Sequence, residues 1–547
     1  MRMPSKMLSS LAACLALSAC GEPDQAAQEP GRSLRQIDRS RLAPPRGVLL
    51  IVIDTLRSDH LGIYNPDHPF SPALDAFAHD AIVFDAMYAS SSWTRSSIAS
   101  IFSSRYPTEI NIVDKNDALA DEVLTVAEVF SANGWQTQGV NTNANSGPAW
   151  NMGQGFDDYG PPHRVKWAKG LGRRKYSAER VTAEILDWLE HRESDKPVFL
   201  YALYVDPHEP YFTYPELMDR PEPPGRFDGS KKGQLQRLDQ LSEGERTRDD
   251  EARIKYQYES EVRNTDRWIG RLLEGLKARK LYDDWVIAVT ADHGEELWNR
   301  GERNHGTSLF DEMVRVPLII RFPSSWSLPP RRVASPAGHV DIAPTLLAAA
   351  GIDVPDEFVG IDLWDDAEDY LLPIPERVVY SEMDRHGRNF DMVSDGNAKL
   401  WRNRVFENDG HLHRHYFTEP DDNLAWLSYI HFGDYRHGDA IKAANPGFFS
   451  AYELPEDGAL PAGVELAIPD RDPEDWGPRL QFFDLQRDAR EKHNTYDEAN
   501  ELQQRMYRQL REIAAGTLAR QGTRYTIIDS QLDQETLKEL RGLGYIQ

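Results

Sequence analysis

Three stretches of the chain are apolar at every position, and each ends at a polar residue. They run from Val48 to Ile53, from Val198 to Val205 and from Trp285 to Thr290. Such runs are typical of central strands that are covered on both faces of a sheet. Between them, apolar residues recur at helical spacing in 181–189 and 262–276. The alternation of strands and helices predicts an α/β fold with a doubly wound, mostly parallel sheet flanked by helices.

Polar residues stand directly after the carboxyl end of each predicted strand. Asp54 follows the first strand, Asp206 and His208 follow the second, and Asp292 and His293 follow the third. Open α/β sheets bind ligands at this edge, because the strand ends and helix N-termini meet there in one crevice. We therefore expect these side chains to converge, although they are far apart in the sequence.

The pattern changes in the last third of the chain, where long irregular stretches separate short periodic ones. Strand-like pieces occur at 378–380 and 399–401, and a helical stretch covers 498–513. A chain of 547 residues is too long for one ordinary core. We predict a large α/β domain at 46–375 and a smaller α+β domain at 376–547.

The first twenty residues have the features of an export signal. Two basic residues precede an apolar stretch of roughly ten residues, which is too short to span a bilayer. The stretch ends in Leu-Ser-Ala-Cys-Gly, which resembles the lipobox of bacterial lipoproteins, with Cys20 as the lipidated residue. We predict a lipoprotein signal peptide at 1–20 and a flexible tether at 21–45. The alternative is an ordinary secretory signal with a chance cysteine.

These features predict an exported, membrane-anchored protein. Gly21 after the lipidated cysteine gives no inner-membrane retention signal, so in a host with two membranes we expect an outer-membrane anchor facing the periplasm. The only other cysteine, Cys14, lies inside the predicted signal peptide. The folded part would therefore have no disulfide, thiolate metal site or cysteine nucleophile.

Charge narrows the class of partner. Lysine and arginine number 62 against 88 acidic residues, so the net charge is 62 − 88 = −26. A surface this acidic repels nucleic acid backbones, so we expect no nucleic acid partner. An anionic substrate would need local positive charge, which a metal ion supplies most simply.

Three polar segments carry candidate chemistry, and each also has a plainer interpretation. Asp54 at a strand end suits a hard metal ion, but aspartate is equally common as a helix N-cap. Asp292 and His293 offer one oxygen and one nitrogen ligand to a single divalent ion. Thr94 lies in the Ser/Thr-rich stretch 92–97, before an apolar helix. A hydroxyl there is a candidate nucleophile, or part of a capping region.

These segments, in this order, resemble the sulfatase family of the alkaline phosphatase superfamily. That family places its nucleophile in a Cys/Ser-x-Pro-x-Arg signature, followed by a helix and Gly-Arg-Tyr-Pro. Counted back from Arg105-Tyr106-Pro107, the nucleophile position falls on Thr94. The similarity extends from about residue 47 to the C-terminus. Further similar segments are Tyr204–Tyr211, His305–Gly306, Val314–Ile320, Asp341–Leu346, Phe483–Leu485 and Leu540–Tyr545.

The resemblance implies an alkaline phosphatase-like fold and a set of site residues. Asp54, Asp292 and His293 would hold a divalent metal ion, with Thr94 reaching it as nucleophile. We expect one ion per chain. A dinuclear site is the alternative, for which Asp206 is one of the few spare ligands.

The resemblance also implies contacts with an anionic ester. His208 and His305 would touch the ester, and one of them would protonate the leaving oxygen. A histidine is also often a structural hydrogen-bonding residue. Arg95, next to the nucleophile, would neutralise substrate charge, or it is a surface residue.

The sequence departs from the family signature at positions that decide the chemistry. Classical sulfatases convert a cysteine or serine to formylglycine, and Thr94 cannot become that aldehyde because its β-carbon carries a methyl group. Ser96 and Ile98 replace the signature proline and arginine. Thr55 follows Asp54, where many sulfatases have a second aspartate. The remaining ligand set suits manganese, zinc or magnesium better than calcium.

We therefore predict a metal-dependent hydrolase that cleaves a phosphate or sulfate ester, with phosphate favoured. Water or an alcohol resolves a phosphothreonine more readily than a sulfothreonine. One alternative is a true sulfatase acting on a sulfated glycan or aryl sulfate. Another is an inactive glycan-binding homologue, with tryptophans such as Trp401, Trp426 and Trp476 lining a sugar groove. Such tryptophans are more often packed in the core or at a domain interface. The charged segment 219–253 is interpreted as a variable insertion beside the crevice.

Overall fold

The computed structural model describes most of the folded part of the chain. The described residues are 42–163, 178–192, 195–227, 247–300, 303–364, 377–385, 388–404, 480–527 and 532–542. The predicted signal peptide and nearly all of the tether lie outside them, so both stay predictions. Among the described residues, no helix has the length and apolar character needed to cross a bilayer.

The three predicted apolar strands lie side by side at the centre of a nine-stranded sheet. They are β1 (Gly47–Ile53), β6 (Val198–Tyr204) and β7 (Trp285–Ala291). β1 pairs in parallel with both others, and Ile53 is opposite Tyr204 on one side and Ala291 on the other. The residues that follow these three strands therefore lie next to one another at the carboxyl-terminal edge of the sheet.

The remaining strands extend this sheet on both sides. The order is β11-β2-β10-β7-β1-β6-β4-β5, with β12 beside β2. β10 runs antiparallel to both neighbours, and the other pairs are parallel. The predicted mostly parallel α/β sheet is confirmed. The outer strands are β2 (Ile82–Tyr88), β4 (Gln136–Asn141), β5 (Asp158–Gly160), β10 (Arg315–Arg321), β11 (Arg331–Val333) and β12 (Ala337–Gly338).

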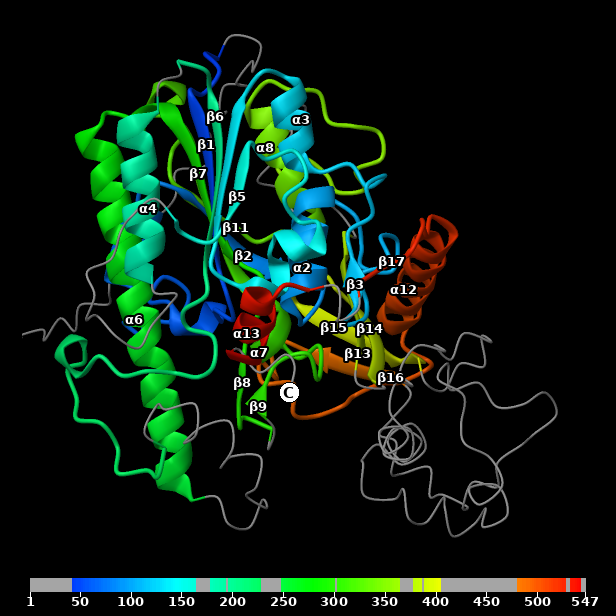
Figure 1. Cartoon of the computed structure of the whole chain (residues 1–547). Coiled ribbons are helices and arrows are strands. Elements are labelled where there is room, and N and C mark those ends of the chain that lie inside the picture. The colour runs from blue at the N-terminus through cyan, green and yellow to red at the C-terminus, as the bar shows by residue number, and fades with distance from the viewer. Residues whose placement is uncertain are drawn as a thin grey trace, which may run out of the picture.

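Helices cover both faces of the sheet, as expected for a doubly wound fold. α4 (Ala178–His191) and α6 (Arg248–Ala278) pack together on one face. On the other face lie α2 (Thr94–Ser103), α3 (Val126–Ala132) and α8 (Ile342–Ala349) (Figure 1). The sheet is thereby buried on both sides, which is why its central strands are apolar at every position.

α6 corrects one expectation. A capping box between Thr247 and Asp250 starts the helix at Arg248, so the last residues of the predicted insertion 219–253 are helical. Residues 228–246 lie outside the described residues.

A second, four-stranded antiparallel sheet follows in the C-terminal part. Its strands are β13 (Val379–Arg385), β14 (Arg388–Ser394), β15 (Ala398–Asn403) and β16 (Leu480–Asp484), in that order. α12 (Glu501–Ala519) packs against it. The predicted strand pieces and helix are confirmed in this small sheet domain. The predicted boundary at 375 lies outside the described residues and stays a prediction.

The tail of the chain returns to the large domain. β17 (Tyr525–Thr526) pairs with β3 (Asp117–Ala118), and α13 (Gln534–Gly542) contacts the segment 144–146. Smaller elements are α1 (Pro72–Ala78), α7 (Asp311–Val314), β8 (Glu296–Leu297) and β9 (Arg303–Asn304).

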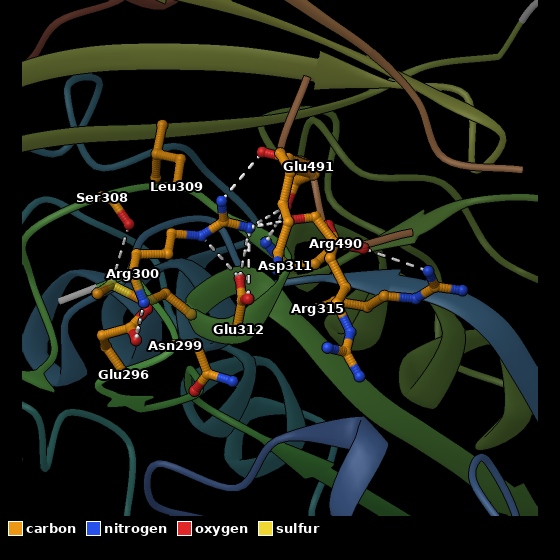
Figure 2. Close-up of polar contacts among 12 residues, drawn as sticks. Glu296, Asn299, Arg300, Ser308, Leu309, Asp311, Glu312, Arg315, Arg490 and Glu491 are labelled. Carbon is orange, nitrogen blue, oxygen red and sulfur yellow. Dashed lines mark hydrogen bonds and ion pairs between the residues drawn. The ribbon is translucent and has the colours of Figure 1, made fainter. Parts of the chain in front are cut away.

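Buried ion pairs join the two sheets. The Lys399 ammonium on β15 is fully buried and pairs with Asp311 of α7 and, at 2.8 Å, with Glu491. Arg300 donates to the carbonyl oxygens of Arg490 and Glu491 at 2.6 and 3.0 Å (Figure 2). These contacts tie the segment after β16 to the loops that follow β7.

Candidate metal and ester site

The polar residues after β1 and β7 meet in one buried cluster. Asp54, Asp292 and His293 are all fully buried, and one donor atom from each lies within 4.8 Å of the others. His293 Nε2 is 3.5 Å from Asp292 Oδ2 and 3.8 Å from Asp54 Oδ1. The backbone N–H of Thr55 donates to Asp292 Oδ1 at 3.1 Å and ties the two strand ends together.

This cluster has the chemistry of a divalent metal site. His293 Nδ1 is 2.8 Å from the Gly294 carbonyl oxygen, so Nδ1 carries the proton and Nε2 presents its lone pair to the carboxylates. Asp54 Oδ1 and Asp292 Oδ2 are buried without a hydrogen-bond partner. Burial raises the pKa of both carboxyl groups, and the charge of Asp292 raises the pKa of Asp54 further. A cation between them would satisfy both orphaned oxygens, so the residues fit a metal ion.

Thr94 lies at the edge of this cluster. It is the first residue of α2, it is fully buried, and its Oγ1 is 3.1 Å from His293 Nε2. The N-terminus of a helix carries partial positive charge, which favours the alkoxide form of a nearby hydroxyl. The structure therefore places the hydroxyl oxygen of Thr94 beside the predicted ligands.

His208 and His305 extend the cluster on one side. The ring of His305 lies 4.5 Å from that of His293 and 4.9 Å from that of His208, centroid to centroid. His305 Nδ1 is 3.2 Å from the Glu295 carboxylate, whereas His208 Nδ1 is 2.6 Å from the Glu209 carbonyl oxygen. The three histidines predicted from the sequence are thus brought together.

Three further residues of the site were not predicted from the sequence. The Asn143 amide donates to Asp54 Oδ2, and Glu295 orients His305. Arg385 on β13 has its guanidinium carbon 4.3 Å from the Trp93 ring centroid, and its charge adds to burial in lowering the pKa of His293 and His208. Asn143 follows β4, so the strand-end rule would have found it, whereas no sequence pattern points to Arg385.

Arg95 has a structural role that the sequence did not indicate. Its side chain is buried, with Nε 3.0 Å from the Asn145 carbonyl oxygen and Nη1 2.9 Å from that of Asp117. Its guanidinium carbon lies 3.3 Å from the centroid of a Trp150 ring. The surface alternative is wrong, and these contacts give no support to the predicted role in substrate binding.

Two alternatives from the sequence find no support among the described residues. Asp206 accepts a hydrogen bond from the backbone N–H of Ala178 at 2.8 Å, and among the described residues it is not grouped with the candidate metal ligands. Trp401 is buried between Phe390 and Phe310, with centroids 5.0 and 4.6 Å away, so it lines no sugar groove. Trp426 and Trp476 lie outside the described residues.

Comparison with known proteins gives a consistent result. The sulfatase family profile matches residues 46–352. An uncharacterised sulfatase of Escherichia coli is 24% identical over 347 residues, which cover 57% of this chain and 69% of that protein.

Solved structures also resemble this chain. One is the structure of a protein in complex with its substrate, D-glucosamine-2-N,6-O-disulfate. It has a TM-score of 0.61 and 17% sequence identity, and the match covers 87% of this chain and 98% of that one. A phosphonate monoester hydrolase of Agrobacterium radiobacter has a TM-score of 0.58 and 17% identity, covering 87% and 96% of the two chains. At these identities the likeness shows the fold.

Proposed function

The chain belongs to the sulfatase family of ester hydrolases, and from this premise we propose that it cleaves phosphate esters in preference to sulfate esters, with Thr94 as nucleophile. One observation carries the proposal: Thr94 Oγ1 lies 3.1 Å from His293 Nε2, beside two buried carboxylates with orphaned oxygens. An oxygen nucleophile, a metal-ligand set and two further histidines then surround one point.

The proposed cofactor is one divalent metal ion per chain. Asp54, Asp292 and His293 would hold it together with Thr94, and manganese, zinc, magnesium or calcium are the candidates. The bound ion would lower the pKa of the Thr94 hydroxyl and polarise the ester oxygens. Arg385 adds positive charge from the small sheet, which helps an anionic ester to approach a protein of net charge −26.

The proposed reaction has two steps. Thr94 gives its proton to water, and its Oγ1 forms a bond to phosphorus as the bond to the leaving oxygen breaks. A histidine, His305 or His208, supplies the proton that the leaving oxygen takes. Water then attacks the phosphothreonine, the bond between Oγ1 and phosphorus breaks, and phosphate leaves while Thr94 regains its proton. The same histidine recovers its proton from the attacking water.

The side chain of Thr94 is the reason for favouring phosphorus. Its methyl-bearing β-carbon cannot become the aldehyde that classical sulfatases use, so turnover requires cleavage of a threonine ester. Water cleaves a phosphothreonine more readily than a sulfothreonine. The second candidate is direct hydrolysis of a sulfate ester, which the family itself and the disulfate substrate of one structural relative favour.

A substrate panel tests the proposal. The full chain would be treated with EDTA, reloaded with manganese, zinc, magnesium or calcium, and assayed on nitrophenyl phosphate, a phosphodiester, a phosphonate monoester and an aryl sulfate. We expect metal-dependent turnover that favours phosphorus, is lost in Thr94→Ala and is kept in the control Thr536→Ala. Preference for sulfate over every phosphorus ester would establish the direct sulfatase instead. A folded, metal-loaded protein without turnover on any ester would favour the inactive glycan-binding homologue.

We also propose that the chain is exported and held by a lipid on Cys20, facing the periplasm from the outer membrane. The support is the sequence of the segment 1–20 alone. Labelled-lipid incorporation in a bacterial host should be lost in Cys20→Ala. Incorporation that survives this substitution would contradict the anchor.

A further inference from the structure

A second group of metal-binding side chains lies outside the site of Thr94. His60 lies at the end of a short 3-10 turn (Ser58–His60), His68 follows eight residues later, and Glu259 lies on α6. One donor atom from each lies within 4.8 Å of the others. All three line a cavity of about 830 Å³. The proposed reaction uses none of them.

His60 is oriented as a metal-binding histidine is. Its Nδ1 is 2.9 Å from Asp59 Oδ1, and Asp59 is itself held by two hydrogen bonds from the Arg57 guanidinium, at 2.9 and 2.8 Å. The carboxylate fixes the tautomer with the proton on Nδ1, so the lone pair of Nε2 is available. A carboxylate that accepts a hydrogen bond from a ligating histidine is a usual feature of the second layer of a metal site.

The other two side chains each have ligand capacity left over. His68 Nδ1 is buried without a hydrogen-bond partner, and the ring stands edge-on to His60 with centroids 4.8 Å apart. Glu259 Oε2 accepts from the Arg220 guanidinium, which leaves Oε1 for a second partner. The three residues therefore offer two imidazole nitrogens and one carboxylate oxygen to one point.

We propose that His60, His68 and Glu259 bind a divalent transition-metal ion of the zinc class, separate from the ion beside Thr94. Two imidazoles and one carboxylate favour zinc and similar ions over calcium and magnesium. Tetrahedral bonds of about 2.1 Å place ligand atoms roughly 3.4 Å apart. The three donor atoms lie within 4.8 Å of one another, so the side chains close by at most ~1.4 Å on binding. The proposal is independent of the proposed function.

The charges around the cavity do not oppose a cation. Five acidic and five basic residues line it, so their formal charges cancel, and some of the lining residues are shown in Figure 2. The acidic residues are Asp59, Asp85, Glu259, Asp311 and Glu312, and the basic residues are Arg57, Lys255, Arg315, Arg332 and Arg490. Two of the neighbouring cations, Arg57 and Arg220, pair with Asp59 and Glu259.

The second ion would support the loop that carries Asp54. The ring of His60 stands edge-on to that of Tyr258, with centroids 5.0 Å apart. Tyr258 Oη donates to the Thr55 carbonyl oxygen at 2.8 Å and accepts from the Arg57 N–H at 3.1 Å. Thr55 has φ 55°, a left-handed conformation that is strained for a β-branched residue. Fixing His60 therefore fixes the tyrosine that holds this strained turn.

Metal content of the full chain tests the proposal. Protein stripped with EDTA would be dialysed against micromolar zinc, washed and analysed by mass spectrometry of the metal. We expect two zinc ions per chain in the wild type and in the control His79→Ala, whose histidine is exposed. His68→Ala and Asp292→Asn should each hold one ion, and the double variant none. Circular dichroism confirms that each variant is folded.

The metal contents of these variants test the second site separately from the proposed function. Two ions in His68→Ala would overturn the second site, whatever the activity. One ion in the wild type, lost in Asp292→Asn and kept in His68→Ala, would overturn it as well. A second readout is the zinc-induced rise in the melting temperature of Asp292→Asn, which should vanish when His68→Ala is added. A rise that persists in that double variant would contradict the assigned ligands.

Discussion

At the scale of single residues, the site of Thr94 contains two buried carboxylates that repel each other unless a cation lies between them. Asp54 and Asp292 are fully buried, each has an oxygen without a partner, and burial raises the pKa of both. Such an arrangement costs stability in the metal-free protein, because buried like charges repel. It is retained, in our account, because the ion needs both carboxylates.

The repulsion between the two carboxylates predicts that removing one charge raises the stability of the metal-free protein and lowers the activity of the metal-loaded protein. Asp54→Asn keeps an oxygen that can accept from Asn143 but removes the charge. In EDTA we expect the variant to be more stable than the wild type by about 1–3 kcal/mol, measured by thermal unfolding. With metal restored, kcat/KM should fall at least ~100-fold. The exposed control Asp353→Asn should change neither quantity. A lower metal-free stability for Asp54→Asn would contradict the account.

The surroundings of the two histidines predict which one protonates the leaving oxygen. Burial lowers the pKa of His208 to about 4, so its ring is neutral, and its Nδ1 faces a carbonyl oxygen. His305 Nδ1 faces the carboxyl group of Glu295 instead, which can share a proton with the ring. We expect His305→Ala to lower kcat/KM by about 100- to 10,000-fold on an alkyl phosphate, and much less on nitrophenyl phosphate, whose leaving group needs little protonation. Equal losses on both substrates would argue against general acid catalysis, and the same pattern in His208→Ala alone would reassign the role.

The sequence predicted part of this site. Asp54, Asp292, His293 and His208 follow apolar strands, and strand ends in a parallel sheet converge whatever the loops do. The buried position of Arg95 was not predicted, because the direction of a side chain depends on tertiary packing, here on Trp150 and on carbonyl oxygens of other segments. Arg385 comes from another sheet and has no local signal.

At the scale of elements, helix α6 shows what the apolar periodicity of the sequence predicts and what it does not. The apolar stripe at 262–276 predicted the helix correctly. The charged first turns were assigned to an insertion, because an apolar stripe is a poor guide where a helix projects beyond the sheet. The capping box at Thr247 and Asp250 was the local signal for the true start.

The contact between α6 and α1 predicts a pH dependence of stability. Asp266 of α6 is buried and accepts from the N–H groups of Ala73 and Leu74 at the start of α1, at 3.0 and 2.8 Å. Burial nevertheless raises its pKa from 3.8 to about 7. Between these two values the folded state holds a proton that the unfolded state has lost, so the stability that this proton gives is full below pH ~4 and lost as the pH rises to ~7.

Asp266→Asn removes this titration. Urea unfolding at intervals from pH 4 to 8 should show that the free energy of unfolding of the wild type falls more steeply than that of the variant, by up to ~1.4 kcal/mol per pH unit below pH ~7. Parallel curves for the two proteins would show that Asp266 is ionised throughout in the folded state.

At the scale of the whole molecule, the alternation of apolar strands and helices was enough to predict the doubly wound sheet. The small antiparallel sheet was predicted from short pieces, since β13 and β15 are strand-like in sequence. The pairing of β17 with β3 was not predicted, because it joins residues some 400 positions apart and neither strand has a distinctive pattern.

The net charge of −26 predicts a salt effect on the reaction. The protein as a whole repels an anionic ester, and salt screens this repulsion over distances beyond about 10 Å. With metal saturating, kcat/KM for a dianionic phosphate monoester should rise by about two- to fivefold between low and physiological salt, and by less for a monoanionic diester. A fall with salt would show that local cations dominate the approach of the substrate.

The central claim is that Thr94 itself attacks phosphorus, and trapping the covalent intermediate tests it most directly. The metal-loaded full chain would be mixed with nitrophenyl phosphate carrying a radiolabelled phosphoryl group, quenched in acid within milliseconds and digested. We predict label on the peptide that contains Thr94, no label after EDTA, and neither label nor turnover in Thr94→Ala. Turnover that survives in Thr94→Ala, or label on another residue, would contradict the claim.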